Sequence, residues 1–221
     1  LSKEESVHQP RNMTQIGYCG PAAYGMADWR LQMQSLYAVL RAFDDPREAW
    51  ELWKARYNEL LATHPSSPMK TADKIKFRGI KVFDYDPKMR FEVDITEDKG
   101  MMQFQDLGVE GHAHYQQLGK TVGLKDALGQ ELSVYWMLGY GGGLFLPFRD
   151  KSAGFETFRT GRILLDALKG ADLGLTKEGK VILDFNFAYH PSTMWDASVD
   201  YISVPDENHL PVKVIAGERV R

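Results

Sequence analysis

Residues 91–96 read Phe-Glu-Val-Asp-Ile-Thr and carry the clearest strand signal in the chain. Apolar side chains at the odd positions alternate strictly with polar side chains at the even positions. Successive side chains of a strand point to opposite faces of a sheet, so this alternation predicts a strand with one buried and one solvated face. Turn-forming residues at 84–87 separate this strand from an earlier apolar run.

Short runs with strand character occur on both sides of this segment. An apolar run at 75–82 is interrupted at Gly79, and further strands are predicted at 101–106, 110–118, 131–138, 143–148, 155–159, 180–189 and 211–216. A short helix is predicted at 162–169. Strands at this spacing favour an antiparallel sheet that forms a barrel or a sandwich.

Two helices are predicted ahead of the sheet. The first covers about 27–43, where apolar residues at 33, 36, 37, 40 and 43 share one helical face. The second begins after Asp45, which is placed to act as N-cap with Pro46 at the first helical position and Glu48 completing a capping box. The predicted fold class is therefore α+β, with N-terminal helices followed by a mostly antiparallel β-barrel or sandwich.

Composition excludes several functional classes. The 221 residues include 27 Lys and Arg against 30 Asp and Glu, a net charge of −3, which disfavours binding of nucleic acid through its phosphates. No apolar run approaches the length of a membrane-spanning helix, so a soluble protein is expected. The single cysteine, Cys19, excludes an internal disulfide. The chain begins at Leu1 rather than Met, which is compatible with removal of a targeting peptide and an organellar location.

Three motifs could in principle bind a ligand or react, but for each of them a purely structural role is favoured. The glycine-rich stretch 139–143 precedes a strand rather than a helix, so a turn between strands is favoured over a phosphate-binding loop. His112 and His114 share one strand face, but two imidazoles do not complete a metal site. Cys19 has no identifiable base, so it is not expected to be a nucleophile. We therefore expect no cofactor and no metal.

Polar residues in the second half of the chain are the candidates for a site. Asp150, Arg162, Asp184, Asn186 and His190 lie near predicted turns or on one predicted strand. Buried charges must be paired, so an Arg162–Asp184 or Arg149–Asp150 ion pair within a structural network is one interpretation. The other is a binding or catalytic site, in which arginines would receive a carboxylate or phosphate and His190 would act as acid or base.

The chain from about 46 to 221 resembles the domain-of-unknown-function family 1684 (DUF1684). The matching segments are YWMLGYGGGLFLPFRD (135–150), SAGFETFRTGRILLDALKGADLG (152–174), LDFNFAYHP (183–191) and PDENHLPVKVIAGE (205–218), with weaker matches at 50–69 and 77–93. The resemblance implies a compact β-rich domain with a leading helix and no established activity. The polar motif positions that it carries over are Arg149, Asp150, Thr157, Arg162, Asp184, Asn186, Glu207 and Asn208. Two cysteines of the family motif are replaced here by Thr193 and Tyr201.

These observations favour a non-catalytic accessory or docking subunit of a larger protein assembly. In this hypothesis residues 1–45 form an extension ahead of the domain at 46–221, and its residues Tyr18, Tyr24, Met26 and Trp29 contact the partner. The alternative is a protein or enzyme that binds a small carboxylate or phosphate around Arg149, Asp150, Arg162, Asp184, Asn186, His190, Glu207 and Asn208. Whether any reaction is catalysed stays open, although the replaced thiols favour a protein that is not an enzyme.

Overall fold

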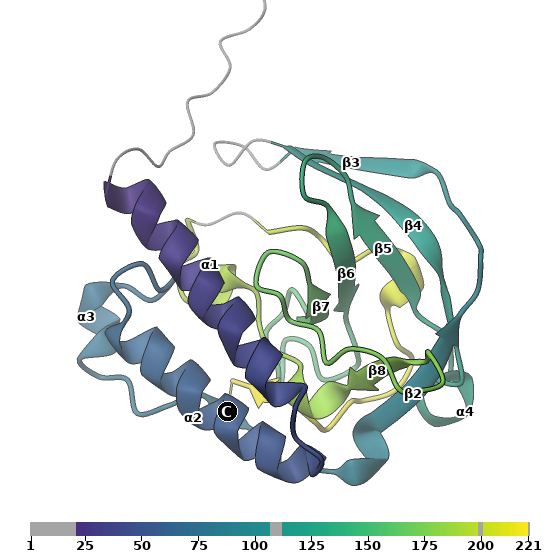
Figure 1. Ribbon diagram of the computed structural model, residues 1–221, viewed down its shortest axis with the longest axis horizontal. Helices are drawn as coiled ribbons and strands as arrows, with labels where there is room; N and C mark the ends of the chain where they lie inside the picture. Colours follow the sequence, from purple (N-terminus) through teal and green to yellow (C-terminus); the bar gives the residue numbers. More distant parts are fainter. Residues whose placement is uncertain (1–20, 107–111, 199–200, 221) are drawn as a thin grey trace, which may run out of the picture.

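The computed structural model describes residues 21–106, 112–198 and 201–220. Helices α1 (Pro21–Leu40) and α2 (Pro46–Thr63) lie side by side along one flank of a strongly curved sheet (Figure 1). The short helices α3 (Thr71–Lys74) and α4 (Lys125–Leu128) lie in connections. The predicted α+β class is confirmed. Within the described residues no helix is both long and apolar enough to cross a membrane.

The main sheet is antiparallel throughout, in the order β7-β6-β5-β4-β2-β8 with β3 paired to β4. Its strands are β2 (Arg90–Ile95), β3 (Met102–Asp106), β4 (His112–Val122), β5 (Ser133–Met137), β6 (Gly143–Phe148), β7 (Arg162–Asp166) and β8 (Val181–Asp184). A separate pair joins β1 (Lys81–Val82) to β9 (Glu218–Arg219). Just after β8, Tyr189 bridges to Ile163 of β7, so the two ends of the sheet meet and nearly close a barrel.

The alternating segment 91–96 behaves as its pattern predicts. Strand β2 pairs with β8 at one end, where Phe91 lies opposite Leu183, and with β4 at the other, where Ile95 lies opposite Thr121. Val93 is 1% exposed and belongs to the core inside the barrel. The glycine-rich stretch at 139–143 joins β5 to β6 as a hairpin, so the interpretation as a turn between strands is confirmed.

A second core lies between the helices and the barrel. Trp53 of α2 is completely enclosed and contacts Tyr57 and Phe187, with ring centroids 5.6 and 5.5 Å away. Because Phe187 follows β8, this contact joins the helical layer to the barrel. The N-cap prediction for α2 is confirmed, since the Asp45 side chain accepts a hydrogen bond from the backbone N–H of Arg47.

Helix α1 begins at Pro21, six residues before the predicted start at 27. Gly25 lies inside the helix, where a Cβ would come within 2.2 Å of Ser66 Oγ. The glycine therefore permits close packing of α1 against the turn that follows α2. Proline at the first helical position is favourable because its missing N–H has no partner there.

The predicted helix at 162–169 is wrong, because residues 162–166 form strand β7. Four of its five residues are buried, so the apolar run shows no alternation and also fits a helical period. The predicted strand at 180–189 ends at Asp184, whose side chain accepts from Asn186 N–H and begins a 3-10 turn at 185–187. The runs at 155–159 and 211–216 form no regular strand, and the run at 75–82 is a strand only at its last two residues.

Candidate functional site

Arg162 and Asp150 form an ion pair inside the protein. Their side chains are 0% and 1% exposed, and Arg162 Nη2 lies 3.2 Å from Asp150 Oδ1. The guanidinium also donates to the backbone carbonyls of Val214 and Ala216, while Asp150 Oδ2 accepts from Val214 N–H at 2.7 Å. The predicted Arg162–Asp184 ion pair is therefore wrong, because the partner of Arg162 is Asp150. The Arg162–Asp150 pair therefore holds the C-terminal segment against the barrel. This contact corresponds to the structural network that the sequence offered as one interpretation.

His190 belongs to the same buried network through Glu218. The Glu218 carboxylate accepts from His190 N–H at 2.6 Å and lies 3.3 Å from His190 Nδ1. His190 Nε2 accepts from the backbone N–H of Phe158 at 3.0 Å, so the ring proton resides on Nδ1. A fully enclosed imidazole whose Nε2 lone pair is already used cannot serve as a base toward a ligand.

Asp184 and Asn186 form a separate arrangement at the junction of the barrel and the helices. Asn186 exchanges hydrogen bonds with the backbone of Asp86, and its own carbonyl accepts from Trp50 Nε1 of α2 at 3.0 Å. Asp184 Oδ1 accepts from the backbone and side chain of Asn186, and Oδ2 has no hydrogen-bond partner among the described residues. Burial raises the pKa of Asp184 to about 6, while the hydrogen bonds from Asn186 act in the opposite direction.

This raised pKa predicts a specific pH dependence of stability. The folded state holds the Asp184 proton more tightly than the unfolded state, so the free energy of unfolding falls as pH rises from about 4 to about 6 and then stays at the lower value. The expected loss is about 2–3 kcal/mol. Asp184→Asn should remove this part of the slope in urea titrations at pH 4 and pH 7. An unchanged slope, equal to that of the exposed variant Asp94→Asn, would contradict the assignment.

A third arrangement contains Arg149, Glu207 and Asn208, where Arg149 N–H donates to the carbonyl of Asn208. Asn208 is buried, exchanges hydrogen bonds with the backbone of Ser133 and also donates to the carbonyl of Pro147. Glu207 accepts from the hydroxyl of Tyr135 at 2.7 Å. The Arg149 side chain is exposed. The eight predicted ligand-binding residues therefore occupy three separate arrangements rather than one site.

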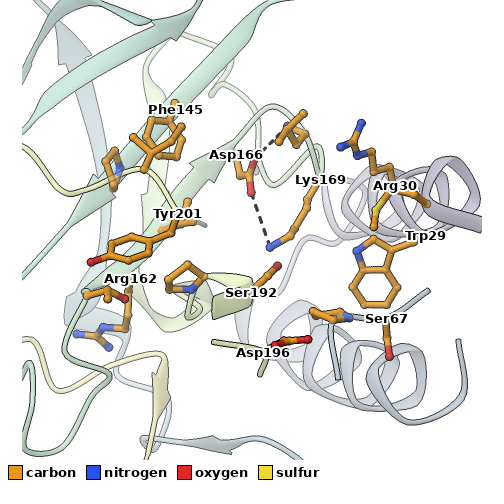
Figure 2. A pocket seen from close by; sticks show the side chains of 18 of the residues that line it. Trp29, Arg30, Ser67, Phe145, Arg162, Asp166, Lys169, Ser192, Asp196 and Tyr201 are labelled. Atoms are coloured by element: carbon orange, nitrogen blue, oxygen red, sulfur yellow. Dashed lines mark hydrogen bonds and ion pairs between the residues drawn. The ribbon is translucent and has the colours of Figure 1, made fainter. Parts of the chain in front are cut away.

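A cavity of about 450 Å³ lies between α1 and the barrel (Figure 2). Its walls come from the first half of α1, the turn after α2, strands β5 to β7 and the segments 191–196 and 201–204. Twelve of the 23 lining residues are apolar: Ala22, Met26, Trp29, Pro68, Met137, Phe145, Pro147, Ile163, Leu168, Pro191, Ile202 and Val204. The charged lining residues are Arg30, Arg162, Asp166, Lys169 and Asp196. Arg162 reaches the wall, but its guanidinium points away from the residues of the opposite wall and toward its own partners.

Lys169 lines this cavity together with the cations Arg30 and Arg162, and its side chain extends into the cavity (Figure 2). Its side chain is 11% exposed, and Nζ lies 3.8 Å from Asp166 Oδ2 and 4.3 Å from the centre of the Tyr189 ring. Asp166 accepts hydrogen bonds from the Tyr189 hydroxyl at 2.7 Å and from Leu168 N–H at 2.9 Å. Burial lowers the pKa of Lys169, and the Asp166 charge acts in the opposite direction.

Sequence reasoning missed Asp166 and Lys169 because it placed them on a helix. An Asp and a Lys three residues apart on an exposed helix face form an ordinary surface pair. The apolar run at 163–165 could have indicated an enclosed strand. A charged residue at the end of such a strand must have a partner, which would have drawn attention to Asp166. Tyr201 also lines the cavity.

The residues predicted to contact a protein partner lie in different environments in the structure. Met26 and Trp29 of α1 line the cavity, and Trp29 contacts the His64 ring edge-on at 5.4 Å. Tyr24 is 80% exposed. Tyr18 lies outside the described residues, as does Cys19.

The motif of two histidines is exposed on the outer face of the sheet. His112 and His114 flank the ring of Phe104, with centroids 5.0 and 5.1 Å away. Among the described residues no three His, Cys, Asp or Glu side chains are grouped to hold a metal ion. The pair therefore lies away from the cavity and contributes to an aromatic surface.

Comparison with known proteins identifies a family and a fold. The model of a family described as a protein of unknown function, DUF1684, matches residues 75–219, a shorter range than the 46–221 expected from the sequence motifs. Among solved structures, the chain is similar to the solution NMR structure of an uncharacterized protein from gene locus rrnAC0354 of Haloarcula marismortui. The identity is 25% and the TM-score 0.56, over 80% of this chain and 98% of that one. No curated protein matches the chain.

Proposed function

The chain belongs to the DUF1684 family, and we propose that it binds a small molecule with an apolar body and an acidic head group in the cavity beside α1. The cavity volume of about 450 Å³ falls in the range of small-molecule sites, which are mostly apolar with a few polar groups that fix orientation. The observation that carries the proposal is the Lys169 ammonium on this apolar wall.

Lys169 is poorly paired by the described residues around it. Hydrogen bonds from nitrogen to oxygen have lengths of about 2.7–3.2 Å, whereas Lys169 Nζ is 3.8 Å from the Asp166 carboxylate. That carboxylate already accepts from Tyr189 and from Leu168 N–H. An enclosed ammonium without short acceptors is costly, and a ligand carboxylate would relieve that cost through charge-assisted hydrogen bonds.

The apolar walls would receive the rest of the ligand. Trp29 of α1 lies across the cavity from Phe145 of the barrel (Figure 2), and Met26 and Ile163 also line it. Each buried methylene adds about 0.8 kcal/mol to binding, so a straight hydrocarbon chain with a carboxylate is a suitable probe.

We expect octanoate to bind and Lys169→Met to weaken its binding about ten-fold or more, because a charge-assisted hydrogen bond contributes about 1.5–3 kcal/mol. Binding of 1-octanol, which has the same chain without the charge, should change little. Methionine keeps an unbranched apolar side chain as long as the lysine stem and lacks only the terminal ammonium, so the cavity should keep its shape. Isothermal titration calorimetry measures both affinities.

The matched control is Lys177→Met, which removes an exposed lysine away from the cavity. It should leave octanoate binding unchanged. The proposal is wrong if the unmodified protein binds neither probe, or if Lys169→Met weakens octanoate and octanol equally.

The docking function expected from the sequence is the second candidate. The observation that favours it is an apolar stripe on α1, where Tyr24, Leu31 and Val39 are 80%, 59% and 51% exposed. Their spacing of seven and eight residues places them on one helical face. The partner would be a protein that presents an apolar surface to this stripe. The native mass of the protein purified gently from its source separates this role from that of a free ligand-binding protein.

A further inference from the structure

We infer that Lys169 captures an apolar aldehyde or ketone in this cavity as a protonated imine with Asp166 as counter-ion. The inference rests on the proposed function, because it uses the same cavity and the same apolar walls. It adds a covalent, reversible step and specifies the chemical class of ligand as a carbonyl compound.

The position of Lys169 is fixed by packing on two sides. It lies in the turn after β7, where a Cβ on the neighbouring Gly170 would come within 2.7 Å of the Gln34 side chain on α1. The turn is therefore pressed against the helix. The ammonium lies over the Tyr189 ring, and the side chain extends toward the centre of the cavity (Figure 2). The amine is thus presented to a bound ligand in one direction, which nucleophilic attack requires.

The surroundings favour the amine as a nucleophile. A lysine desolvated by an apolar pocket has a lowered pKa, so more of it is neutral and able to attack. Asp166 lies 3.8 Å away, near enough to take the departing proton through a small movement of the lysine. At this distance Lys169 Nζ and Asp166 do not form the short hydrogen bond that would hold the proton on nitrogen.

The step is balanced without a further reactant. The ammonium gives one proton to Asp166, and the neutral Nζ attacks the carbonyl carbon. A proton then passes from nitrogen to the former carbonyl oxygen to form a neutral carbinolamine, and Asp166 returns its proton to the hydroxyl group. Loss of water then gives the carbon–nitrogen double bond, and the protonated imine carries the single positive charge that the ammonium had. The sum is ammonium plus carbonyl giving protonated imine plus water.

The Asp166 carboxylate would stabilise the product as well as assist its formation. Two hydrogen-bond donors, Tyr189 and Leu168 N–H, hold it in place. Because the imine nitrogen keeps a positive charge at the position of the ammonium, the ion pair persists after capture. Water that would reverse the reaction is excluded by the ligand chain against the apolar walls.

The test uses octanal with sodium cyanoborohydride on the full chain. Reduction fixes the imine as one octyl group, which intact mass and peptide mapping locate. We expect Lys169 to be labelled about ten-fold faster than any exposed lysine, as a desolvated and oriented amine should be. Excess octanoate should suppress this labelling, and Lys169→Met should abolish the fast phase while Lys177→Met should not.

Asp166→Asn tests the positioning role of the carboxylate. It should slow labelling of Lys169 and strengthen octanoate binding, because it removes both the proton acceptor and a negative charge that repels the carboxylate. A general loss of structure would weaken both. Slower labelling without loss of octanoate binding supports the role, and unchanged labelling overturns it.

Failure of this inference is distinguishable from failure of the proposed function. If octanoate binds but octanal labels Lys169 no faster than exposed lysines, the imine is excluded and the binding proposal stands. If octanoate does not bind and Lys169 is not labelled preferentially, both are wrong.

Discussion

Asp150→Asn is expected to lower the free energy of unfolding by about 3–5 kcal/mol, because it leaves the buried charge of Arg162 without its partner. The change also puts an amide in place of a carboxylate that accepts from Arg162 and from Val214 N–H. The amide cannot satisfy both as an acceptor in one orientation. The wider effect should be loosening of the C-terminal segment, since the pair holds residues 214–218 against the barrel.

Urea unfolding at neutral pH measures this effect, and Asp94→Asn is the matched control. Asp94 is 65% exposed and lies 3.6 Å from Lys180, so the same substitution breaks an exposed ion pair there. That pair should contribute no more than about 1 kcal/mol. If the two variants lose similar stability, the Arg162–Asp150 pair is not the internal fastening that the structure indicates.

Features that depend on local chemistry could be predicted from the sequence. The strict alternation at 91–96 predicted β2, and Asp45 followed by Pro46 predicted the start of α2. The hairpin at 139–143 followed from its glycines, several of which adopt a positive φ. Each of these signals lies within a few residues of the structure it determines.

Features that depend on distant packing could not be predicted. Strand β7 is covered on both sides, which removes the alternation by which a strand is recognised. Arg162 receives its backbone partners from residues more than fifty positions later in a segment without strand pairing. The cavity arises from α1 packed beside the barrel, so Lys169 has a functional interpretation only once that packing is known.

Four of the eight polar positions carried over from the family resemblance form hydrogen bonds that hold distant parts of the backbone together. Arg162, Asp150, Asn186 and Asn208 each bind backbone groups far away in the sequence. They join irregular segments that no sheet ladder holds. A motif of such residues is therefore an indication of the fold, and of these four only Arg162 lines the candidate cavity.

Trp53→Ala is expected to lower the free energy of unfolding by about 3–5 kcal/mol, the cost of removing a fully enclosed tryptophan. The ring lies between Tyr57 and Phe187, so its loss leaves a void where the helices join the barrel. The matched control is Trp136→Ala on β5, where the ring is 43% exposed and the cost should stay below about 1 kcal/mol. Denaturant unfolding followed by far-ultraviolet circular dichroism measures both.

The same substitution should weaken octanoate binding under conditions in which the barrel is still folded. Trp29 and Met26 form the helical wall of the cavity, and they belong to the same apolar core as Trp53. A void in that core lets α1 and α2 shift relative to the barrel, so the two walls no longer close on the ligand. Trp136→Ala should bind octanoate normally. If Trp53→Ala costs little and binding persists, the helical layer does not form the wall, and the cavity must be built by the barrel alone.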